Sequence, residues 1–311
     1  MIFKTKLLDY NRHKIIYPLR GIKLFVDLIK IIENKGPYDI IHCHNGWESG
    51  ICVLVAKLKG INIRIVHSHG VYINEGKNII LKSYNNLNKK LIQHKSSIKI
   101  SCSDKAGESL FGLNSDFCNV LNPIKINPHL TYTSLIKNDE KCINILQIGY
   151  YASNKNQIFS LSLLKKLIEN GYSVHLNFIG YINEKNYFEE MKEYIDKKNL
   201  NDYVSFLPHD YDKQKIFSDT SVLLLPSHQE GLGIVLLEAQ AAGVKCIASS
   251  NVSSDANLGL CQFVSLKSKD LWIEKIININ NYECEINMEL LEKVSIDNYL
   301  KTIRSIYYSK K

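Results

Sequence analysis

Two glutamates, Glu230 and Glu238, stand eight residues apart in the stretch "SHQEGLGIVLLEAQAAG" at residues 227–243. An apolar run of helical spacing joins them, and at ~1.5 Å per residue this helix would separate the carboxylates by roughly 10–12 Å. That separation fits a long ligand with hydroxyls at both ends and phosphate between them. A nucleotide sugar has this form, with its hexose hydroxyls near Glu230 and its ribose hydroxyls near Glu238.

Gly231 and Gly233 follow the first glutamate, where the expected strand "SVLLLPS" passes into the helix. Free N–H groups and the positive dipole end at a helix N-terminus attract phosphate oxygens, and glycine lets a ligand approach the backbone closely. Gly243 can end the helix as its C′ residue. A bare pair of glutamates is more often a dipole-compensating residue and a solvated helix position, so the surrounding elements decide between the two interpretations.

Short apolar runs alternate along the chain with longer segments of helical period, which is typical of βαβ units with a parallel sheet. The expected strands cover 38–44, 62–69, 97–103, 118–123, 142–149, 173–180, 203–207, 221–227 and 244–249. The expected helices cover 21–34, 48–59, 79–95, 104–111, 156–170, 184–199, 211–218, 232–242, 268–280 and 295–308. The sequence therefore predicts an α/β fold of two tandem, Rossmann-like, doubly wound domains, which bind ligands at the carboxyl ends of their strands.

Length and composition agree with a globular protein of two domains. The chain has 311 residues, of which 45% are hydrophobic and 23% charged. The polar stretch at 127–141 contains a proline and no clean periodicity, so we place the boundary there, with domains at 1–137 and 138–311. No run of signal-peptide or membrane-span type is present, which favours a cytoplasmic protein. Eight scattered cysteines without a C-x-x-C pair indicate reduced thiols.

The charge is unevenly divided between the two halves. Residues 1–137 hold 20 Lys and Arg against 9 Asp and Glu, a net charge of +11, whereas residues 138–311 hold 19 against 22, a net charge of −3. A basic first half indicates an anionic partner such as a phospholipid surface, a lipid diphosphate or nucleic acid, although a solvated lysine-rich surface explains it equally well. The usual nucleic-acid-binding motifs are missing, so no nucleic-acid partner is predicted.

The segment at 78–95 approximates an amphipathic helix within this basic half. Its apolar residues lie at 80, 81, 84, 87, 91 and 92, and its lysines at 82, 89, 90 and 95. Such a face could dock on the anionic inner leaflet of a membrane. An ordinary core-facing helix with solvated lysines fits the same pattern.

The stretch "LLLPSHQEGLGIVLLEAQAAG" resembles the E-x7-E signature of retaining GT-B glycosyltransferases of family 4, especially those of bacterial exopolysaccharide and capsule clusters. Five further segments follow the order and spacing of that family, so the resemblance covers about residues 20–308. They are "YDIIHCH", "RIVHSH", "SDKAGESLFG", "ILQIGYYASNKNQ" and "NVSSDANLGLCQFVSLKSKDLWIEKI". It implies a GT-B fold with an acceptor-side domain first and a nucleotide-sugar-binding domain second, the last helix crossing back to the first domain. It also implies transfer of a hexose from a nucleoside diphosphate sugar to a polyprenyl-diphosphate-linked saccharide, without metal or other cofactor.

The resemblance also assigns roles to particular residues. Glu230 would hold the donor-sugar hydroxyls, Glu238 the ribose, and Lys155 of "NKNQ" would neutralise the departing diphosphate. The donor-binding set it implies is Gly149, Lys155, Glu230, Gly231, Leu232, Gly233 and Glu238. One position differs, because the family usually has an arginine after the glycine of this strand end, and here Tyr150 follows Gly149.

Histidines end two consecutive expected strands, at positions 42 and 44 and at positions 67 and 69. Alternation puts the members of each pair on one face, so the pairs can converge at the edge of the sheet. Three interpretations compete: a zinc site, polar lining of an acceptor pocket, or ordinary strand-end residues. No acidic or cysteine ligand spacing supports a metal, so none is predicted. His69 matches a family histidine that contacts the donor sugar or the transition state, and His44 and His67 are interpreted as pocket lining.

Family members usually begin with a strand and a glycine-rich loop, and this sequence starts at what resembles a later part of that domain. We therefore expect the first domain to lack its first strand and roughly 50–70 residues. This expectation leaves open a second function, a catalytically inactive, truncated remnant that binds a sugar nucleotide or a partner without turnover.

Two rival motifs are weaker. Asp210-x-Asp212 resembles the metal-binding D-x-D of GT-A glycosyltransferases, but its place ahead of a short helix favours helix capping. A dinucleotide-binding G-x-G-x-x-G is excluded because Leu236 occupies the third glycine position.

Overall fold

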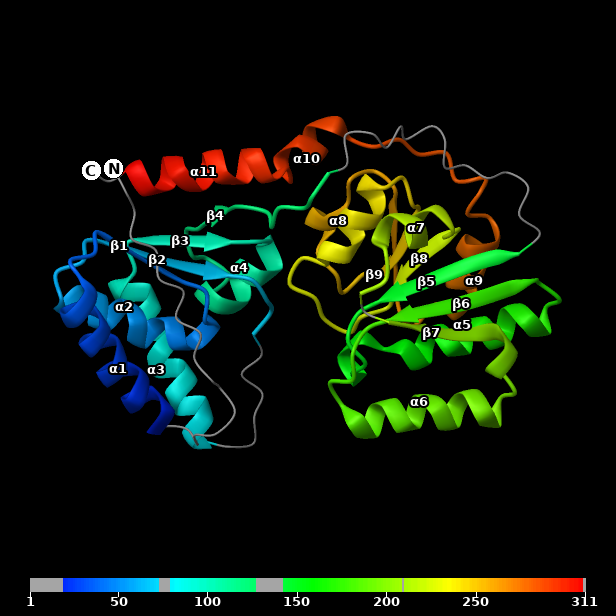
Figure 1. Cartoon of the computed structure of the whole chain (residues 1–311), viewed down its shortest axis with the longest axis horizontal. Coiled ribbons are helices and arrows are strands. Elements are labelled where there is room, and N and C mark those ends of the chain that lie inside the picture. The colour runs from blue at the N-terminus through cyan, green and yellow to red at the C-terminus, as the bar shows by residue number, and fades with distance from the viewer. Residues whose placement is uncertain (1–18, 73–78, 127–141, 209, 310–311) are drawn as a thin grey trace. The chain divides into compact units, whose positions relative to one another are not determined.

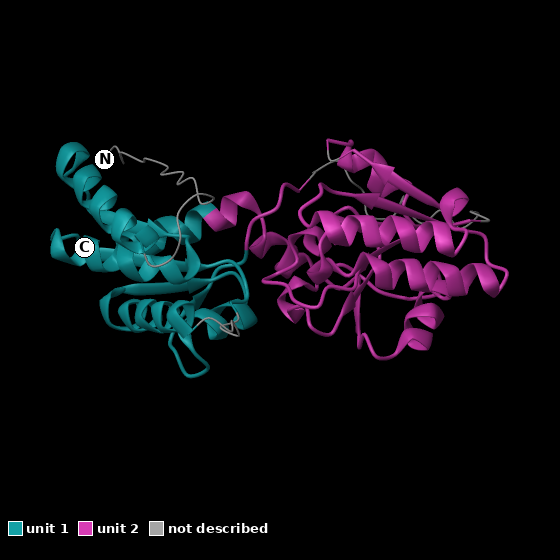
Figure 2. Ribbon diagram, turned by 90° about the horizontal axis from the view of Figure 1, so that it is seen from below, with its two compact units in different colours: residues 1–121, 300–311 teal, residues 122–299 magenta. Residues whose placement is uncertain are grey.

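The chain forms two compact units in the computed structural model, which describes residues 19–72, 79–126, 142–208 and 210–309. Unit 1 comprises Met1–Leu121 with Leu300–Lys311, and unit 2 comprises Asn122–Tyr299 (Figure 2). The boundary predicted after residue 137 lies outside the described residues. The end of the chain nevertheless returns to unit 1, because the second part of the last helix belongs to it.

Unit 1 contains a parallel sheet with the strand order β1-β2-β3-β4. Its strands are β1 (Ile40–Cys43), β2 (Ile63–Ser68), β3 (Ile98–Ser101) and β4 (Cys118–Asn119). Its helices are α1 (Leu19–Lys35), α2 (Ser49–Leu58), α3 (Ile79–Lys95) and α4 (Asp104–Phe111). Helices α1 to α3 lie on one side of the sheet, and the unit 1 part of α11 (Ile296–Tyr308) lies on the other (Figure 1).

The strand order differs between the two units. Within the described residues each strand of unit 1 is added on the same side of the one before it. The reversal of direction that marks the ligand-binding edge of a doubly wound sheet lies, among the described strands, in unit 2. Residues 1–18, which precede α1, lie outside the described part of the chain.

Unit 2 contains a six-stranded parallel sheet in the order β10-β9-β8-β5-β6-β7. Its strands are β5 (Ile143–Ile148), β6 (Val174–Ile179), β7 (Val204–Leu207), β8 (Val222–Leu225), β9 (Cys246–Ser249) and β10 (Cys261–Val264). Its helices are α5 (Gln157–Glu169), α6 (Lys185–Lys197), α7 (Lys213–Ser218), α8 (Ile234–Ala241), α9 (Lys269–Ile277) and α10 (Met288–Lys293). The order reverses between β5 and β8, and a crevice at the carboxyl ends of these two strands is where such sheets bind ligands.

Hydrophobic periodicity predicted most of these elements to within a few residues. Two were not predicted, namely β10 and α10. Strand β10 has only four residues, one of them the polar Gln262, and it exists because it pairs in parallel with β9. Helix α10 is a six-residue helix whose start is capped by Asn287, which accepts a hydrogen bond from the Leu290 N–H. Elements this short have too few residues to show a period.

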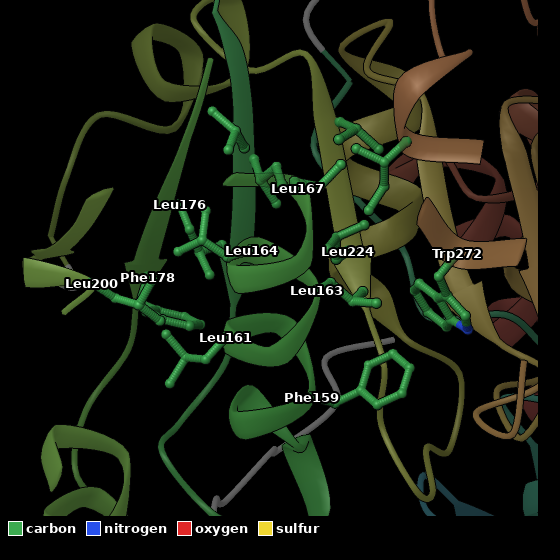
Figure 3. Packing of buried hydrophobic residues seen from close by; sticks show 14 of the residues in the cluster. Phe159, Leu161, Leu163, Leu164, Leu167, Leu176, Phe178, Leu200, Leu224 and Trp272 are labelled. Atoms are coloured by element: carbon green, nitrogen blue, oxygen red, sulfur yellow. The ribbon is translucent and has the colours of Figure 1, made fainter. Parts of the chain in front are cut away.

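The core of unit 2 holds α5 against the sheet (Figure 3). Leu161 and Leu164 repeat at helical spacing on α5 and are fully buried, as are Phe178 of β6 and Trp272 of α9. Burying a side chain of this size stabilises a fold by roughly 1.5–3 kcal/mol. The packing fixes the N-terminus of α5, and with it the loop that carries Lys155.

No helix in the described ranges combines the length and the apolar character required to cross a bilayer.

Candidate functional site

The candidate site of unit 2 is built by the two loops that leave β5 and β8. The first, residues 149–156, leads into α5, and the second, residues 226–233, leads into α8. Three hydrogen bonds to backbone carbonyls join them: from the His228 N–H to the Asn154 carbonyl at 2.9 Å, from the Asn154 side-chain amide to the Gln229 carbonyl at 2.8 Å, and from the Asn156 side-chain amide to the Pro226 carbonyl at 3.1 Å. The loops therefore form one connected surface at the reversal point of the sheet.

Lys155 and Glu230, which the family resemblance assigns to the donor from separate motifs, meet on this surface. The Lys155 ammonium group donates a hydrogen bond to Oε1 of Glu230, and each side chain is 13% exposed. The Ser227 hydroxyl donates to the same oxygen at 3.0 Å, and the Gln147 side chain donates to the Lys155 carbonyl at 2.8 Å. Two opposite charges that are largely removed from water stabilise each other, whereas either charge alone would destabilise the folded protein.

The arrangement can bind a ligand that carries both phosphate and hydroxyl groups. The ammonium group is a donor for phosphate oxygens, and the carboxylate is an acceptor for sugar hydroxyls. Gly149 lies beside the lysine, since a Cβ at this glycine would be 3.6 Å from Lys155 Cδ. The Tyr150 ring, which stands where an arginine was expected, has its centroid 5.0 Å from Lys155 Nζ. The face of the Tyr150 ring thus lies beside the Lys155 ammonium group, where the family usually has a second cation.

The segment Gly231–Gly233 leads directly into α8. Gly233 is the N-cap residue with φ +81°, a left-handed conformation that favours glycine. Leu232 is 2% exposed, so its side chain anchors the loop in the core and leaves only its backbone for a ligand. Gly243, with φ +82°, follows the C-cap residue Ala242, which confirms the predicted end of the helix.

Replacing Gly233 with Ala should destabilise the protein and distort this loop. A Cβ would lie 3.3 Å from both Leu225 Cδ2 and Val252 Cγ1, in addition to the left-handed backbone. Gly171 is the matched control, because its φ is +82° and no atom lies within 4 Å of its Cβ position. We expect Gly171→Ala to lower the free energy of unfolding by about 1–2 kcal/mol, the cost of a left-handed backbone at a residue with a Cβ. Gly233→Ala should lower it by about 1 kcal/mol more, because its Cβ is also overpacked. Urea unfolding measures both, and equal losses would contradict the crowding argument.

Glu238 lies on α8 and is held by a residue that the sequence did not single out. Lys213, the first residue of α7, places its ammonium group 2.7 Å and 2.9 Å from the two carboxylate oxygens. The Glu238 side chain is 26% exposed and the Lys213 side chain 58%, so a ligand can reach both charges. The preceding Asp212 caps α7 by accepting a hydrogen bond from the Gln214 N–H at 2.9 Å, which confirms its predicted capping role.

The second group of predicted residues lies in unit 1, at the carboxyl ends of β1 and β2. His42 pairs with Ile65 in the register of these strands, so by alternation His42, His44, His67 and His69 share one face of the sheet. The ring centroids of His67 and His69 are 4.0 Å apart, those of His42 and His44 4.2 Å, and those of His44 and His67 5.3 Å. The four imidazoles, some stacked and some tilted against one another, form a group that we call the histidine cluster.

Two hydrogen bonds orient the histidine cluster. Nδ1 of His44 lies 2.7 Å from Nε2 of His69, and Nδ1 of His42 lies 2.8 Å from the Tyr307 hydroxyl of α11. Burial is the main reason that the pKa of His42 falls to about 3, that of His44 to about 4 and that of His67 to about 2, and neighbouring imidazoles lower each of them further. These three rings are therefore neutral at physiological pH. His42 was not assigned a role from the sequence, although its i, i+2 spacing to His44 already placed it in this group.

Comparison with known proteins identifies the class. The family model for "Glycosyl transferases group 1" matches residues 134–257. EpsF of Bacillus subtilis (strain 168), which is classed as a glycosyltransferase, is 30% identical over 260 residues, covering 79% of this chain and 67% of EpsF. A galactosyltransferase of Escherichia coli, "UDP-Gal:alpha-D-GlcNAc-diphosphoundecaprenol alpha-1,3-galactosyltransferase", is 23% identical over 86% of this chain and 74% of its own length. The chain belongs to the glycosyl transferases group 1 family.

Solved structures show the same fold. HepE of Anabaena, in complex with UDP-glucose, matches with a TM-score of 0.74 at 14% identity, covering 94% of this chain and 84% of HepE. The lipopolysaccharide outer core galactosyltransferase WaaB in its apo form matches with a TM-score of 0.70 at 17% identity, covering 94% and 81% of the two chains. The two parallel α/β units are therefore those of the GT-B glycosyltransferase fold, as predicted.

Proposed function

We propose that the protein transfers a hexose from a nucleoside diphosphate sugar to a polyprenyl-diphosphate-linked saccharide during exopolysaccharide or capsule biosynthesis. The reaction retains the anomeric configuration, as in family 4, and uses no metal ion at the diphosphate. In this proposal Lys155 neutralises the departing diphosphate, Glu230 holds the sugar hydroxyls and Glu238 holds the ribose. His69 contacts the donor sugar or the transition state, and His44 and His67 line the acceptor pocket.

The observation that carries the proposal is the Lys155–Glu230 pair at the reversal point of the unit 2 sheet. A cation and an acceptor lie side by side, next to a glycine segment that opens a helix. Departure of a diphosphate requires stabilisation of its developing negative charge, and a fixed ammonium group with backbone N–H groups can supply it. Two relatives support the choice of substrates, since HepE binds UDP-glucose and the Escherichia coli relative is named for a lipid-linked acceptor.

The proposal is tested by incubating the protein with a panel of nucleoside diphosphate sugars and a polyprenyl-diphosphate-linked saccharide. Release of nucleoside diphosphate together with a glycosylated lipid is the expected result, and proton NMR of the product reports its anomeric configuration. Binding of UDP without turnover of any donor would instead favour the inactive sugar-nucleotide-binding protein.

A lipid-linked acceptor is anchored in a membrane, so the enzyme must bind it at the membrane surface. We propose that the protein attaches peripherally to the inner leaflet through α3. Tyr84, Asn88 and Ile92 of this helix are buried, whereas Ile79, Ile80 and Leu87 are 78%, 59% and 57% exposed. The exposed lysines Lys82 and Lys90 lie on the same helix. Apolar side chains next to cations are the combination that binds an anionic lipid surface.

Reversing these two charges, in Lys82→Glu/Lys90→Glu, should reduce co-flotation with vesicles that contain anionic phospholipid. Each lysine near such a surface contributes about 1 kcal/mol, so we expect a loss of at least about tenfold in the partition coefficient. Lys89 is kept, because its ammonium group lies 5.8 Å from the Trp47 ring and belongs to the packing of unit 1. The control Lys197→Glu/Lys198→Glu makes the same charge change on exposed residues at the end of α6. Unchanged flotation of the α3 variant would overturn membrane attachment through this helix.

A further inference from the structure

The histidine cluster contains buried polar atoms that nothing in the described part of the chain satisfies. His67 has no exposed surface, and neither Nδ1 nor Nε2 of its ring has a hydrogen-bond partner among the described residues. Nε2 of His42 is buried in the same way. Burying an unpaired polar group costs roughly 1–3 kcal/mol, so three such atoms in one place indicate a missing partner. Hydrogen bonding within the cluster does not supply it, because the rings of His42 and His67 stack rather than meet edge to edge.

Three of these rings each bring one nitrogen close to those of the other two. His42, His44 and His67 each offer a ring nitrogen, and the three nitrogens lie within 4.8 Å of one another. In a tetrahedral zinc site, with Zn–N near 2.0–2.1 Å, the ligating nitrogens are about 3.3 Å apart. Binding therefore requires side-chain rotations that bring the nitrogens up to roughly 1.5 Å closer. The same rotations must turn the stacked rings of His42 and His67 so that both lone pairs face the ion.

We propose that His42, His44 and His67 form a binding site for a Zn²⁺ ion at the carboxyl ends of β1 and β2, with the fourth coordination position open. The set consists of neutral imidazoles only. Imidazole suits Zn²⁺ and neighbouring transition metals, whereas Mg²⁺ and Ca²⁺ require oxygen ligands that these three residues do not offer. All three proposed ligands belong to unit 1, and the proposal departs from the sequence-based expectation that no metal binds the cluster.

The surroundings of two of the three rings, those of His42 and His44, match those of metal-binding histidines. Such histidines donate their other ring N–H to a neighbouring acceptor, which fixes the tautomer and the ring orientation. Nδ1 of His42 has the Tyr307 hydroxyl as its partner, and Nδ1 of His44 has Nε2 of His69. Both contacts engage Nδ1 and leave Nε2 of the same ring available to a metal ion. Tyr307 and His69 thus act as positioning residues for the ion.

The site is also accessible to an ion. His44 is exposed while His67 is fully buried, so the cluster opens to solvent on the His44 side. Three protein ligands and one open position are typical of zinc sites that take a water molecule or a ligand oxygen, whereas purely structural sites use four protein ligands.

The test measures Zn²⁺ binding by the full chain, first stripped of metal with a chelator and then titrated against a chromophoric competitor. We expect one tightly bound Zn²⁺ per chain, and X-ray absorption at the zinc edge should show three imidazole nitrogens near 2.0 Å. His44→Ala removes an exposed ligand and should weaken binding at least about 100-fold, and Tyr307→Phe, which removes only a positioning hydroxyl, should weaken it roughly 10- to 100-fold. His94→Ala, at an exposed histidine of α3, is the control and should bind like wild type.

Binding that is absent in wild type, or that is equal in wild type, His44→Ala and Tyr307→Phe, would overturn the proposal. An absorption spectrum without imidazole scattering would do the same. UDP titration of each variant confirms that unit 2 is folded. Because UDP binding is expected to be insensitive to the chelator, failure of the zinc site and failure of the proposed donor site give different results.

Discussion

Glu230→Gln should lower the rate of hexose transfer by about 10²- to 10³-fold, the size of effect that follows removal of one electrostatic contact to a transition state. The same substitution should leave the affinity for UDP unchanged or slightly higher. The two effects differ in direction because Glu230 serves the sugar while it also holds the Lys155 ammonium group. Without the carboxylate, that ammonium group has no competitor for the diphosphate.

The measurement combines steady-state transfer kinetics with calorimetric titration of UDP. Glutamine keeps the shape of the side chain and an acceptor for the Ser227 hydroxyl, which lies 3.0 Å from the carboxylate. Glu193→Gln is the matched control, since Glu193 also pairs with a lysine, Lys197, but on the exposed surface of α6. Equal kinetics in wild type and Glu230→Gln, or an equal fall in transfer and UDP affinity, would contradict the role given to this carboxylate.

Lys155→Met should weaken UDP binding by about 10- to 100-fold and leave uridine binding unchanged. A charge-assisted hydrogen bond contributes roughly 1.5–3 kcal/mol, and 1.4 kcal/mol corresponds to a factor of ten. Uridine has no phosphate, so its binding should not depend on the ammonium group. Transfer should fall together with UDP affinity, because the leaving group loses its neutralising cation.

Calorimetric titrations at two salt concentrations test this prediction. The contribution of Lys155 should change little with salt, since its side chain is only 13% exposed and is weakly screened. Lys197→Met removes an exposed lysine of α6 and serves as the control. An equal loss of affinity for uridine and UDP would show that the substitution damages the loop rather than a phosphate contact. Because Met also leaves Glu230 unpaired, Lys155→Met/Glu230→Gln separates that cost from the loss of the cation.

The sequence predicted the elements because they depend on local patterns, and it pointed to Glu230 by the glycines and helix beside it and to Lys155 by the family resemblance. Glu230 and Lys155 each follow a strand with a clear apolar run, and the carboxyl ends of parallel strands meet at one edge of a sheet. The order of the strands was needed to show that β5 and β8 are neighbours. The sequence spacing does not reveal which strands are neighbours, because Lys155 and Glu230 are 75 positions apart in the chain.

The partners that came from distant elements could not be predicted. Lys213 reaches Glu238 from the start of α7, and Tyr307 reaches His42 across 265 residues from the last helix. A lysine at a helix start and a tyrosine near a chain end have no local signature that distinguishes them from surface residues. The histidine cluster was visible as two i, i+2 pairs, but the pattern gave neither their stacking nor the buried ring nitrogens of His67.

The central claim, that the strand ends of β5 and β8 bind the nucleotide of the donor, is tested most directly by hydrogen–deuterium exchange with and without UDP. The account predicts slower exchange in peptides covering residues 149–157 and 226–238, with little change in α6 and α9. Slower exchange confined to unit 1, or no difference in these two peptides at a UDP concentration that saturates binding, would contradict it.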